Sequence, residues 1–192
     1  MQILCETAGP LETLIDNDRG LCLYAVAVAC AKLEGEFWEC GVYRGGSAAI
    51  IAQAVRDSRL RTLRLFDTFR GIPDSDPSID IHQRGEFASP EEFVRKGLPD
   101  DFVSIHAGLI PRSFLGLEAC KIAFAHVDLD LYWSTRDAVD FIWPRLVTGG
   151  AMVFDDYHWK SCPGVERVLD ERFCGRIIEL GSYQAMVKKE AL

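Results

Sequence analysis

The stretches AHVDLD (residues 125–130) and AMVFDD (residues 151–156) decide the fold of this 192-residue chain. Each is an apolar run that ends in carboxylates, as a buried parallel strand does at the edge of its sheet. About one β-α-β crossover separates them, so both are expected to end at the same carboxyl edge, where open α/β sheets bind ligands. Asp128, Asp155 and Asp156 would then meet and repel one another unless a cation lies between them. Their hard oxygens favour Mg²⁺, Mn²⁺ or Ca²⁺ over Zn²⁺.

Strand and helix patterns alternate on both sides of these runs. Further strands are predicted at 36–40, 62–66, 102–106 and 121–127, with one after Gly149-Gly150 and a closing antiparallel pair at 176–180 and 184–188. Helices are predicted at 19–33, from Ser47, from Pro90, at 132–142 and at 163–173. This order predicts one α/β domain over residues 1–192, with a Rossmann-like, doubly wound, mostly parallel sheet and an N-terminal helical cover over 1–34.

The composition excludes several classes of protein. A formal net charge of −8 argues against nucleic acid and against an anionic membrane surface as partners. No apolar run is long enough to span a bilayer, and no secretory signal pattern opens the chain. The seven cysteines form no C-x-x-C pair, which is typical of buried thiols in a cytoplasmic protein.

A glycine-rich turn, ECGVYRGGS (residues 39–47), follows the first predicted strand. Glycines let a ligand approach the backbone, and the helix start offers free N–H donors. A P-loop needs Lys where Ser47 stands, and a dinucleotide fingerprint needs Gly where Tyr43 stands. An adenosyl ligand without phosphate needs an acid after the second strand for its ribose, and Asp67 occupies that place. These features favour S-adenosylmethionine; a ligand-free turn with Asp67 as a cap is the alternative.

Residues 68–89 are predicted to form a long surface loop, because Gly, Pro, Ser and Asp recur along them. Loops of this length in a compact domain usually serve a function. We interpret this one as a lid or an acceptor contact. The alternatives are a solvent-exposed loop without a ligand and a contact in a dimer.

Four blocks together resemble one family: ECGVYRGGS (39–47), FDTFRGIP (66–73), VDLDLYWST (127–135) and FDDY (154–157). They are similar to the macrocin O-methyltransferases, which methylate sugar hydroxyls on natural products. The similarity runs from about residue 19 to residue 187. It implies a class I methyltransferase fold, S-adenosylmethionine as cofactor, and a requirement for Mg²⁺ or Mn²⁺.

The resemblance also implies roles for individual residues. Asp128, Asp155 and Asp156 would hold the metal, and Asp128 would also be the general base. The cofactor-binding residues that it implies are Glu39, Gly41, Tyr43, Arg44, Gly45, Ser47, Asp67 and Gly108. To these we add Thr68, Phe69 and Asp128, which lie beside the matched positions. His158, beside the second acidic run, is a catalytic candidate that could reach the acceptor. Asp130 is either a helix-capping residue or a direct ligand.

We therefore expect an O-methyltransferase, dependent on S-adenosylmethionine and a divalent metal, that acts on a hydroxyl of a sugar or glycosylated natural product. A metal would stabilise the alkoxide, and a carboxylate would take its proton. The partners expected are a small hydroxylated acceptor and a second copy of the chain. Alternatives are a phenol or catechol O-methyltransferase, although Leu131 stands where the catechol enzymes carry Lys, and a non-catalytic cofactor-binding subunit. A D-x-D phosphohydrolase is disfavoured because Tyr132 occupies the usual Thr place.

Overall fold

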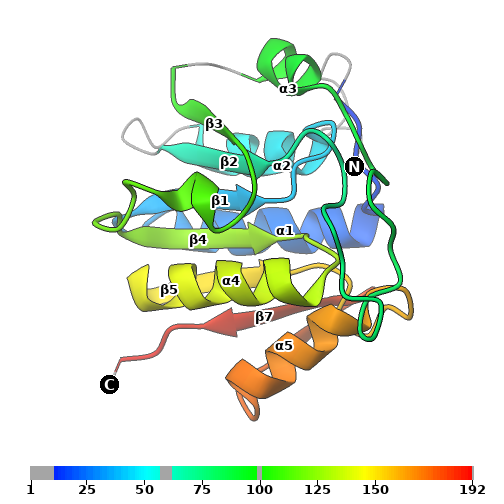
Figure 1. Ribbon diagram of the computed structural model, residues 1–192. Coiled ribbons are helices and arrows are strands. Elements are labelled where there is room, and N and C mark those ends of the chain that lie inside the picture. Colours follow the sequence, from blue (N-terminus) through cyan, green and yellow to red (C-terminus); the bar gives the residue numbers. More distant parts are fainter. Residues whose placement is uncertain (1–10, 57–61, 99–100, 192) are drawn as a thin grey trace.

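The computed structural model describes residues 11–56, 62–98 and 101–191, and within these ranges seven strands form one sheet (Figure 1). The strands are β1 (Glu36–Cys40), β2 (Leu63–Asp67), β3 (Val103–Ala107), β4 (Ile122–Val127), β5 (Leu146–Phe154), β6 (Ile178–Gly181) and β7 (Gln184–Lys188). Their order is β3-β2-β1-β4-β5-β7-β6. The first five strands are parallel, while β7 runs antiparallel to β5 and β6. This confirms the predicted doubly wound, mostly parallel sheet.

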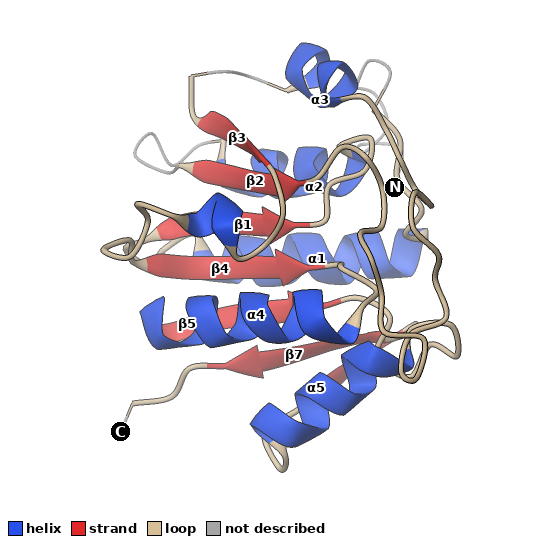
Figure 2. Ribbon diagram, in the orientation of Figure 1, coloured by secondary structure: helices blue, strands red, loops and turns tan. Residues whose placement is uncertain are grey.

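Helices cover both faces of this sheet (Figure 2). The helices are α1 (Asn17–Cys30), α2 (Gly46–Val55), α3 (Glu91–Gly97), α4 (Tyr132–Ile142) and α5 (Pro163–Phe173), with short 3-10 turns η1 (Arg112–Phe114) and η2 (Trp143–Arg145). Because side chains alternate along a strand, each strand feeds two cores. Phe37 packs on the face of α1 and α2, and its neighbour Trp38 on the face of α4 and α5.

Several boundaries differ by one to three residues from the predicted ones, among them the end of α1 at Cys30 in place of residue 33. Two differences have a clear physical reason. Helix α1 begins before residue 19 because Asp16 caps it, accepting a hydrogen bond from the backbone N–H of Arg19 at 2.9 Å. Gly150 lies inside β5 rather than before it, next to a shift in the β4–β5 register. A Cβ at Gly150 would lie 2.7 Å from the carbonyl oxygen of Ala123, so a glycine lets the two strands pair here.

Loop 68–89 runs along the carboxyl ends of the strands toward α5 and then returns to α3 (Figure 1). It is held by its own backbone, since the N–H of Ile72 donates to the carbonyl of Glu86 at 2.8 Å and that of Gly85 to the carbonyl of Ile72 at 2.9 Å. Buried Asp80 also ties it to α4, accepting from the backbone N–H of Tyr132 at 2.9 Å. Whether the loop opens as a lid stays a prediction.

The N-terminal cover was predicted over 1–34, of which residues 11–34 are described. Helix α1 packs on the sheet beside α2, and residues 12–15 reach the carboxyl edge. Among the described residues, no helix combines the length and apolar character that a bilayer crossing requires.

Candidate active site

A cavity of about 290 Å³ opens at the carboxyl edge of the sheet. It lies beside the ends of β1 and β4, where the strand order reverses, which is the usual ligand position in such sheets. Its walls come from residues 12–15, the turn after β1, loop 68–89, the residues after β3, and the segments after β4 and β5.

The turns after β1 and β4 are packed directly against each other. The backbone N–H of Asp128 donates to the carbonyl of Cys40 at 2.8 Å. Gly41 has φ +88, and a Cβ there would lie 1.7 Å from the carbonyl oxygen of Asp128. Gly41 is therefore required by backbone packing as well as by the left-handed conformation.

Asp67, at the end of β2, holds the glycine-rich turn. Its Oδ2 accepts from the backbone N–H groups of Val42 (2.7 Å) and Tyr43 (2.9 Å), and its Oδ1 accepts from that of Phe69 (2.7 Å). Each carboxylate oxygen has two acceptor sites, so Asp67 keeps acceptor capacity toward the cavity that it lines.

The structure divides the predicted cofactor-binding residues into two groups. Those that line the cavity are Gly41, Tyr43, Ser47, Asp67, Thr68, Gly108 and Asp128. The other four do not line it. Glu39 is fully buried, Arg44 pairs with Glu12 and lies over the ring of Phe93, Gly45 is the N-cap of α2, and Phe69 packs on the α2 side of the core.

Asp128, Asp130 and Asp156, here called the acidic cluster, each place a carboxylate oxygen within 4.8 Å of the others. All three line the cavity. Asp130 and Asp156 have φ values of 59 and 62, a conformation that non-glycine residues seldom adopt and that is frequent at functional sites. The cluster thus brings together two of the three predicted metal residues, with Asp130 as the third member.

Asp155, the remaining predicted ligand, faces protein cations instead. Its Oδ1 lies 3.1 Å from Nη1 of Arg19, and its Oδ2 lies 3.1 Å from Nε2 of His126 and 3.3 Å from Nε2 of Gln184. It is buried and does not line the cavity, although it is close enough to Asp128 to share an ion with it.

Burial and mutual repulsion change the protonation of these acids. Burial, then the charges of Asp155 and Asp156, raise the pKa of Asp128 well above its usual range. Burial, then the charge of Asp130, raise the pKa of Asp156 to about 6. Burial also opposes ionisation of Asp155, but hydrogen bonding to His126 outweighs it and lowers the pKa. A bound cation would relieve this repulsion between the carboxylates.

His126 lies on β4 as a buried link behind the cluster. Its Nδ1 is 3.0 Å from Oε1 of Glu39, and its Nε2 faces Asp155. Burial opposes a charged imidazole, but the hydrogen bonds to Asp155 and Glu39 prevail and raise the pKa of His126 to about 10. The ring is therefore a cation that fixes both acids in place.

His158 does not take the predicted catalytic position. Its side chain is 46 % exposed, its Nδ1 lies 3.2 Å from Oε2 of Glu166, and its ring packs on Tyr157 outside the cavity wall. With φ 65 the backbone turns this side chain toward α5. The catalytic assignment of His158 is therefore dropped.

The cavity residues that sequence patterns did not single out include three beside the acidic cluster: Arg19, His82 and Cys162. Arg19 reaches the site only because α1 packs beside β5, and its Nη1 lies 3.5 Å from Oδ1 of Asp156. His82 belongs to the long loop, whose path no periodicity predicts. Cys162 is the N-cap residue of α5.

Known proteins share both this fold and these blocks. The profile of the macrocin-O-methyltransferase (TylF) family matches residues 20–173. An 8-demethyl-8-(2,3-dimethoxy-alpha-L-rhamnosyl)-tetracenomycin-C 4'-O-methyltransferase of Streptomyces olivaceus is 33% identical over 155 residues, which are 72% of this chain and 59% of that protein. The demethyldecarbamoylnovobiocin O-methyltransferase of Streptomyces niveus is 32% identical over 155 residues, 73% of this chain and 58% of that one. The chain thus spans less than two thirds of these relatives.

Two solved structures have the same fold. The O-methyltransferase NovP superposes with a TM-score of 0.80 at 25% identity, covering 93% of this chain and 82% of that chain. A calicheamicin methyltransferase superposes with a TM-score of 0.77 at 23% identity, covering 88% of this chain and 78% of that chain. Since the family profile covers most of the sheet, the cavity and α5, the chain belongs to the macrocin O-methyltransferase family.

Proposed function

We propose that the chain is an S-adenosylmethionine-dependent O-methyltransferase that uses a divalent cation, Mg²⁺ or Mn²⁺, to methylate a hydroxyl of a sugar unit on a natural product. The observation that carries the proposal is that one cavity contains both the glycine-rich turn with Asp67 and the acidic cluster. A methyl donor at the turn and a hydroxyl at the cluster would share this space.

The donor set of the acidic cluster fits a hard divalent ion. Its carboxylate oxygens are close together and partly withdrawn from water, and Arg19 at the edge of Asp156 and His126 behind Asp128 offset only part of their charge. We assign Asp130 and Asp156 as ligands, with Asp128 beside them and Asp155 positioned from behind by His126. When bound, Mg²⁺ would polarise the acceptor hydroxyl and stabilise its alkoxide.

The chain's own side chains supply the remaining steps. Asp128 would accept the hydroxyl proton as the carboxylate that a bound cation keeps ionised, and its burial makes that carboxylate a stronger base than an exposed one. A methyl donor held by the glycine-rich turn and Asp67 would present its methyl carbon in line to the alkoxide oxygen, so that the oxygen–carbon bond forms as the carbon–sulfur bond breaks and S-adenosylhomocysteine is released. Cavity walls that hold both reactants in line contribute much of the acceleration. Ile72 and Phe87 of loop 68–89 line the cavity and form its apolar wall on that side.

A sugar acceptor is favoured by the cavity and by the relatives. Trp159 lines the cavity, is 44% exposed and packs edge-on to Tyr183 with ring centroids 4.5 Å apart. Such an exposed ring suits the apolar face of a sugar. The two curated relatives are named for a rhamnosylated tetracenomycin and a novobiocin precursor. Leu131 lacks the amine that the catechol enzymes carry at this place.

The test is turnover with labelled S-adenosylmethionine on a panel of rhamnosylated aromatic polyketides, aminocoumarin glycosides and free catechols. Methyl gain on a sugar hydroxyl that is lost with EDTA and restored by Mg²⁺ is the expected result. Full activity in EDTA would reject the metal role, and methylation of catechols alone would reject the sugar acceptor. Binding of S-adenosylhomocysteine without turnover on any acceptor would favour a non-catalytic subunit.

A further inference from the structure

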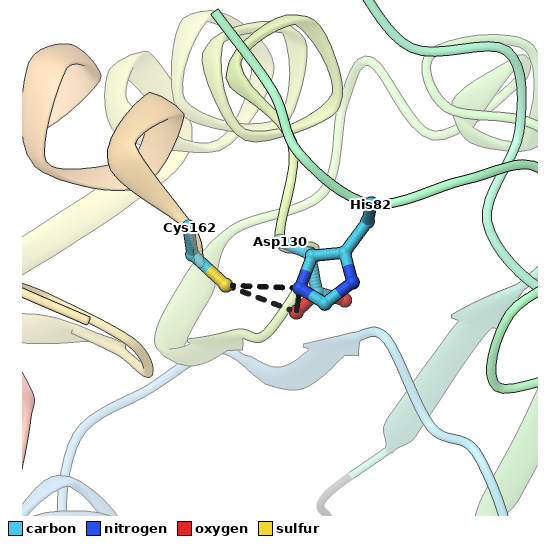
Figure 3. A group of neighbouring side chains, drawn as sticks. All are labelled: His82, Asp130 and Cys162. Carbon is cyan, nitrogen blue, oxygen red and sulfur yellow. Dashed lines mark hydrogen bonds and ion pairs between the residues drawn. The ribbon is translucent and has the colours of Figure 1, made fainter. Parts of the chain in front are cut away.

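Three donor atoms of different chemistry meet on the cavity wall beside the acidic cluster (Figure 3). They are Nε2 of His82 from loop 68–89, Oδ1 of Asp130 after β4, and Sγ of Cys162 before α5. Sγ lies 3.5 Å from Nε2 and 3.4 Å from Oδ1, and Nε2 and Oδ1 are 3.9 Å apart. The proposed methyl transfer uses neither the thiol nor the imidazole.

These separations suit a tetrahedral metal. With Zn–S near 2.3 Å and Zn–N or Zn–O near 2.0–2.1 Å, a tetrahedral ion holds its ligand atoms roughly 3.3–3.6 Å apart. Both contacts of Cys162 fall in that range, and the His82–Asp130 separation of 3.9 Å has to close by about half an ångström.

The imidazole is oriented for this role. Oε2 of Glu86 lies 2.6 Å from Nδ1 of His82, which directs Nε2 toward Asp130 and Cys162. A carboxylate on the far nitrogen of a ligating histidine is the usual support in zinc sites, because it fixes the ring and its tautomer.

The sulfur is held equally well. Cys162 is only 1% exposed, and its backbone N–H donates to the carbonyl of Trp159 at 2.9 Å. Its thiol faces two carboxylates, Asp130 and Asp156, in place of apolar neighbours alone. A thiolate in this place needs a cation to compensate its charge.

We propose that His82, Asp130 and Cys162 form a second metal site, selective for a thiophilic divalent ion such as Zn²⁺, that shares Asp130 with the acidic cluster. As the Cys162 sulfur–metal bond forms, the thiol proton passes to solvent. Mg²⁺ has little affinity for thiolate or imidazole, so it does not compete for this set.

Sharing Asp130 makes the two sites antagonistic. An ion bound to His82 and Cys162 draws Asp130 away from the hard-ion position and places a second positive charge beside it. Zn²⁺ is therefore expected to inhibit the methyl transfer in the presence of saturating Mg²⁺. This consequence rests on the proposed function, whereas the binding itself does not.

The experiment titrates Co²⁺, a spectroscopic substitute for Zn²⁺, into the full chain in excess Mg²⁺. We expect a thiolate-to-cobalt charge-transfer band that saturates at one ion per chain and that Zn²⁺ abolishes. Cys162→Ser should lose the band. His82→Gln should weaken Co²⁺ binding by more than the roughly 10–100-fold that loss of an outer-shell partner costs. Cys174→Ser, at an exposed cysteine, is the matched control and should keep the wild-type titration.

Several results would overturn the site: no thiolate band in the wild type, a band that persists in Cys162→Ser, or one that Cys174→Ser removes. Circular dichroism checks each fold. If Cys162→Ser does not fold, the His82→Gln variant decides, because the His82 side chain lies on a loop outside the core. Unchanged Co²⁺ affinity in His82→Gln would reject the proposal.

The inhibition is measured separately. At saturating Mg²⁺, the fold-loss of methyl transfer that Zn²⁺ causes should be at least 10 times larger in the wild type than in His82→Gln. A wild type that shows the Co²⁺ band but methylates no acceptor would reject the proposed function and leave the metal site standing. A wild type that methylates an acceptor but shows no Co²⁺ band would reject the metal site and leave the proposed function standing.

Discussion

Arg19 and Asp155 form an ion pair that ties the first turn of α1 to the end of β5, with Nη1 of Arg19 3.1 Å from Oδ1 of Asp155. Asp155 is buried beneath the acidic cluster, so this pair links the N-terminal segment to the site. The Arg19 guanidinium also lies near Asp156, and it supplies positive charge on the side of the cluster that faces α1.

Arg19→Met should lower the free energy of unfolding by about 1.5–3 kcal/mol, because a charged hydrogen bond to a buried carboxylate is lost. His126 remains beside Asp155, so the loss should be partial. Urea denaturation measures it. Arg84→Met, which removes an exposed ion pair with Asp74, is the control and should leave the midpoint unchanged. Equal effects of both substitutions would contradict the structural role of Arg19.

Gly41→Ala should be among the most damaging substitutions in the chain. The new Cβ would meet the backbone of Asp128, and the position has φ +88, so we expect a loss of roughly 3–5 kcal/mol or failure to fold. Gly116→Ala is the matched control, since Gly116 has φ +84 but no atom near the added Cβ. That control should cost only the strain of the left-handed conformation, about 1–2 kcal/mol. Similar melting temperatures for the two variants would refute the packing argument.

The ion pair of Glu36 and Arg64 should make the free energy of unfolding fall at acidic pH. Nε and Nη2 of Arg64 donate to Oε2 and Oε1 of Glu36 at 2.7 and 2.8 Å. Burial would raise the pKa of Glu36, but the hydrogen bonds from Arg64 and Trp38 lower it below its usual range. The stabilisation is therefore present above the pKa of an unfolded glutamate, about 4.3, and is lost as pH falls through the folded value.

The measurement is the urea midpoint between neutral and acidic pH. Wild type should lose stability below the usual glutamate range, and Glu36→Gln should be less stable at neutral pH but should lose less on acidification. Glu118→Gln, at an exposed position, is the control and should follow the wild-type profile. A Glu36→Gln profile parallel to that of wild type would show that this pair does not set the acid limit.

The sequence predicted the architecture well because apolar strand runs and turn residues are local signals. Such patterns predicted the succession of strands and helices along the chain, the glycine-rich turn, Asp67 and the edge position of Asp128 and Asp156. The sequence left open whether Asp130 is a helix cap or a metal ligand. Its place in the acidic cluster depends on its backbone φ of 59, and no pattern of residue types encodes that angle. Arg19 and His82 reach the site only through packing between distant segments.

The same limit explains why two predicted site residues, His158 and Asp155, do not line the cavity. His158 follows the second acidic run directly, but its left-handed backbone points the side chain to Glu166. Asp155 and Asp156 are neighbours in sequence and emerge on different sides of the strand end. One of them therefore meets His126 and the other the cavity. Adjacent acids in a sequence are thus weak evidence for a shared role.

Asp67→Asn should weaken the binding of S-adenosylhomocysteine by roughly 10–100-fold, because an amide cannot accept from the turn N–H groups and a ribose at once. Isothermal titration calorimetry measures the change. Asp74→Asn, on the exposed part of loop 68–89, is the control and should bind as the wild type does. Wild-type affinity in Asp67→Asn would show that this acid supports the turn without contacting the cofactor.

Asp128→Asn and Asp155→Asn should have opposite effects on stability, although the two acids lie close enough to share an ion. Asp128 is a half-buried acid surrounded by other acids, which oppose its ionisation, so its neutral analogue should leave the metal-free protein as stable or more stable. Methyl transfer by Asp128→Asn should fall about 100–10,000-fold through loss of the general base.

Asp155→Asn instead leaves the buried His126 cation and Arg19 without their shared partner, and should lower the free energy of unfolding by about 3–5 kcal/mol. Urea unfolding in a chelator and single-turnover methyl transfer separate these cases. Destabilisation by Asp128→Asn with retained turnover would reverse the roles assigned to the two carboxylates.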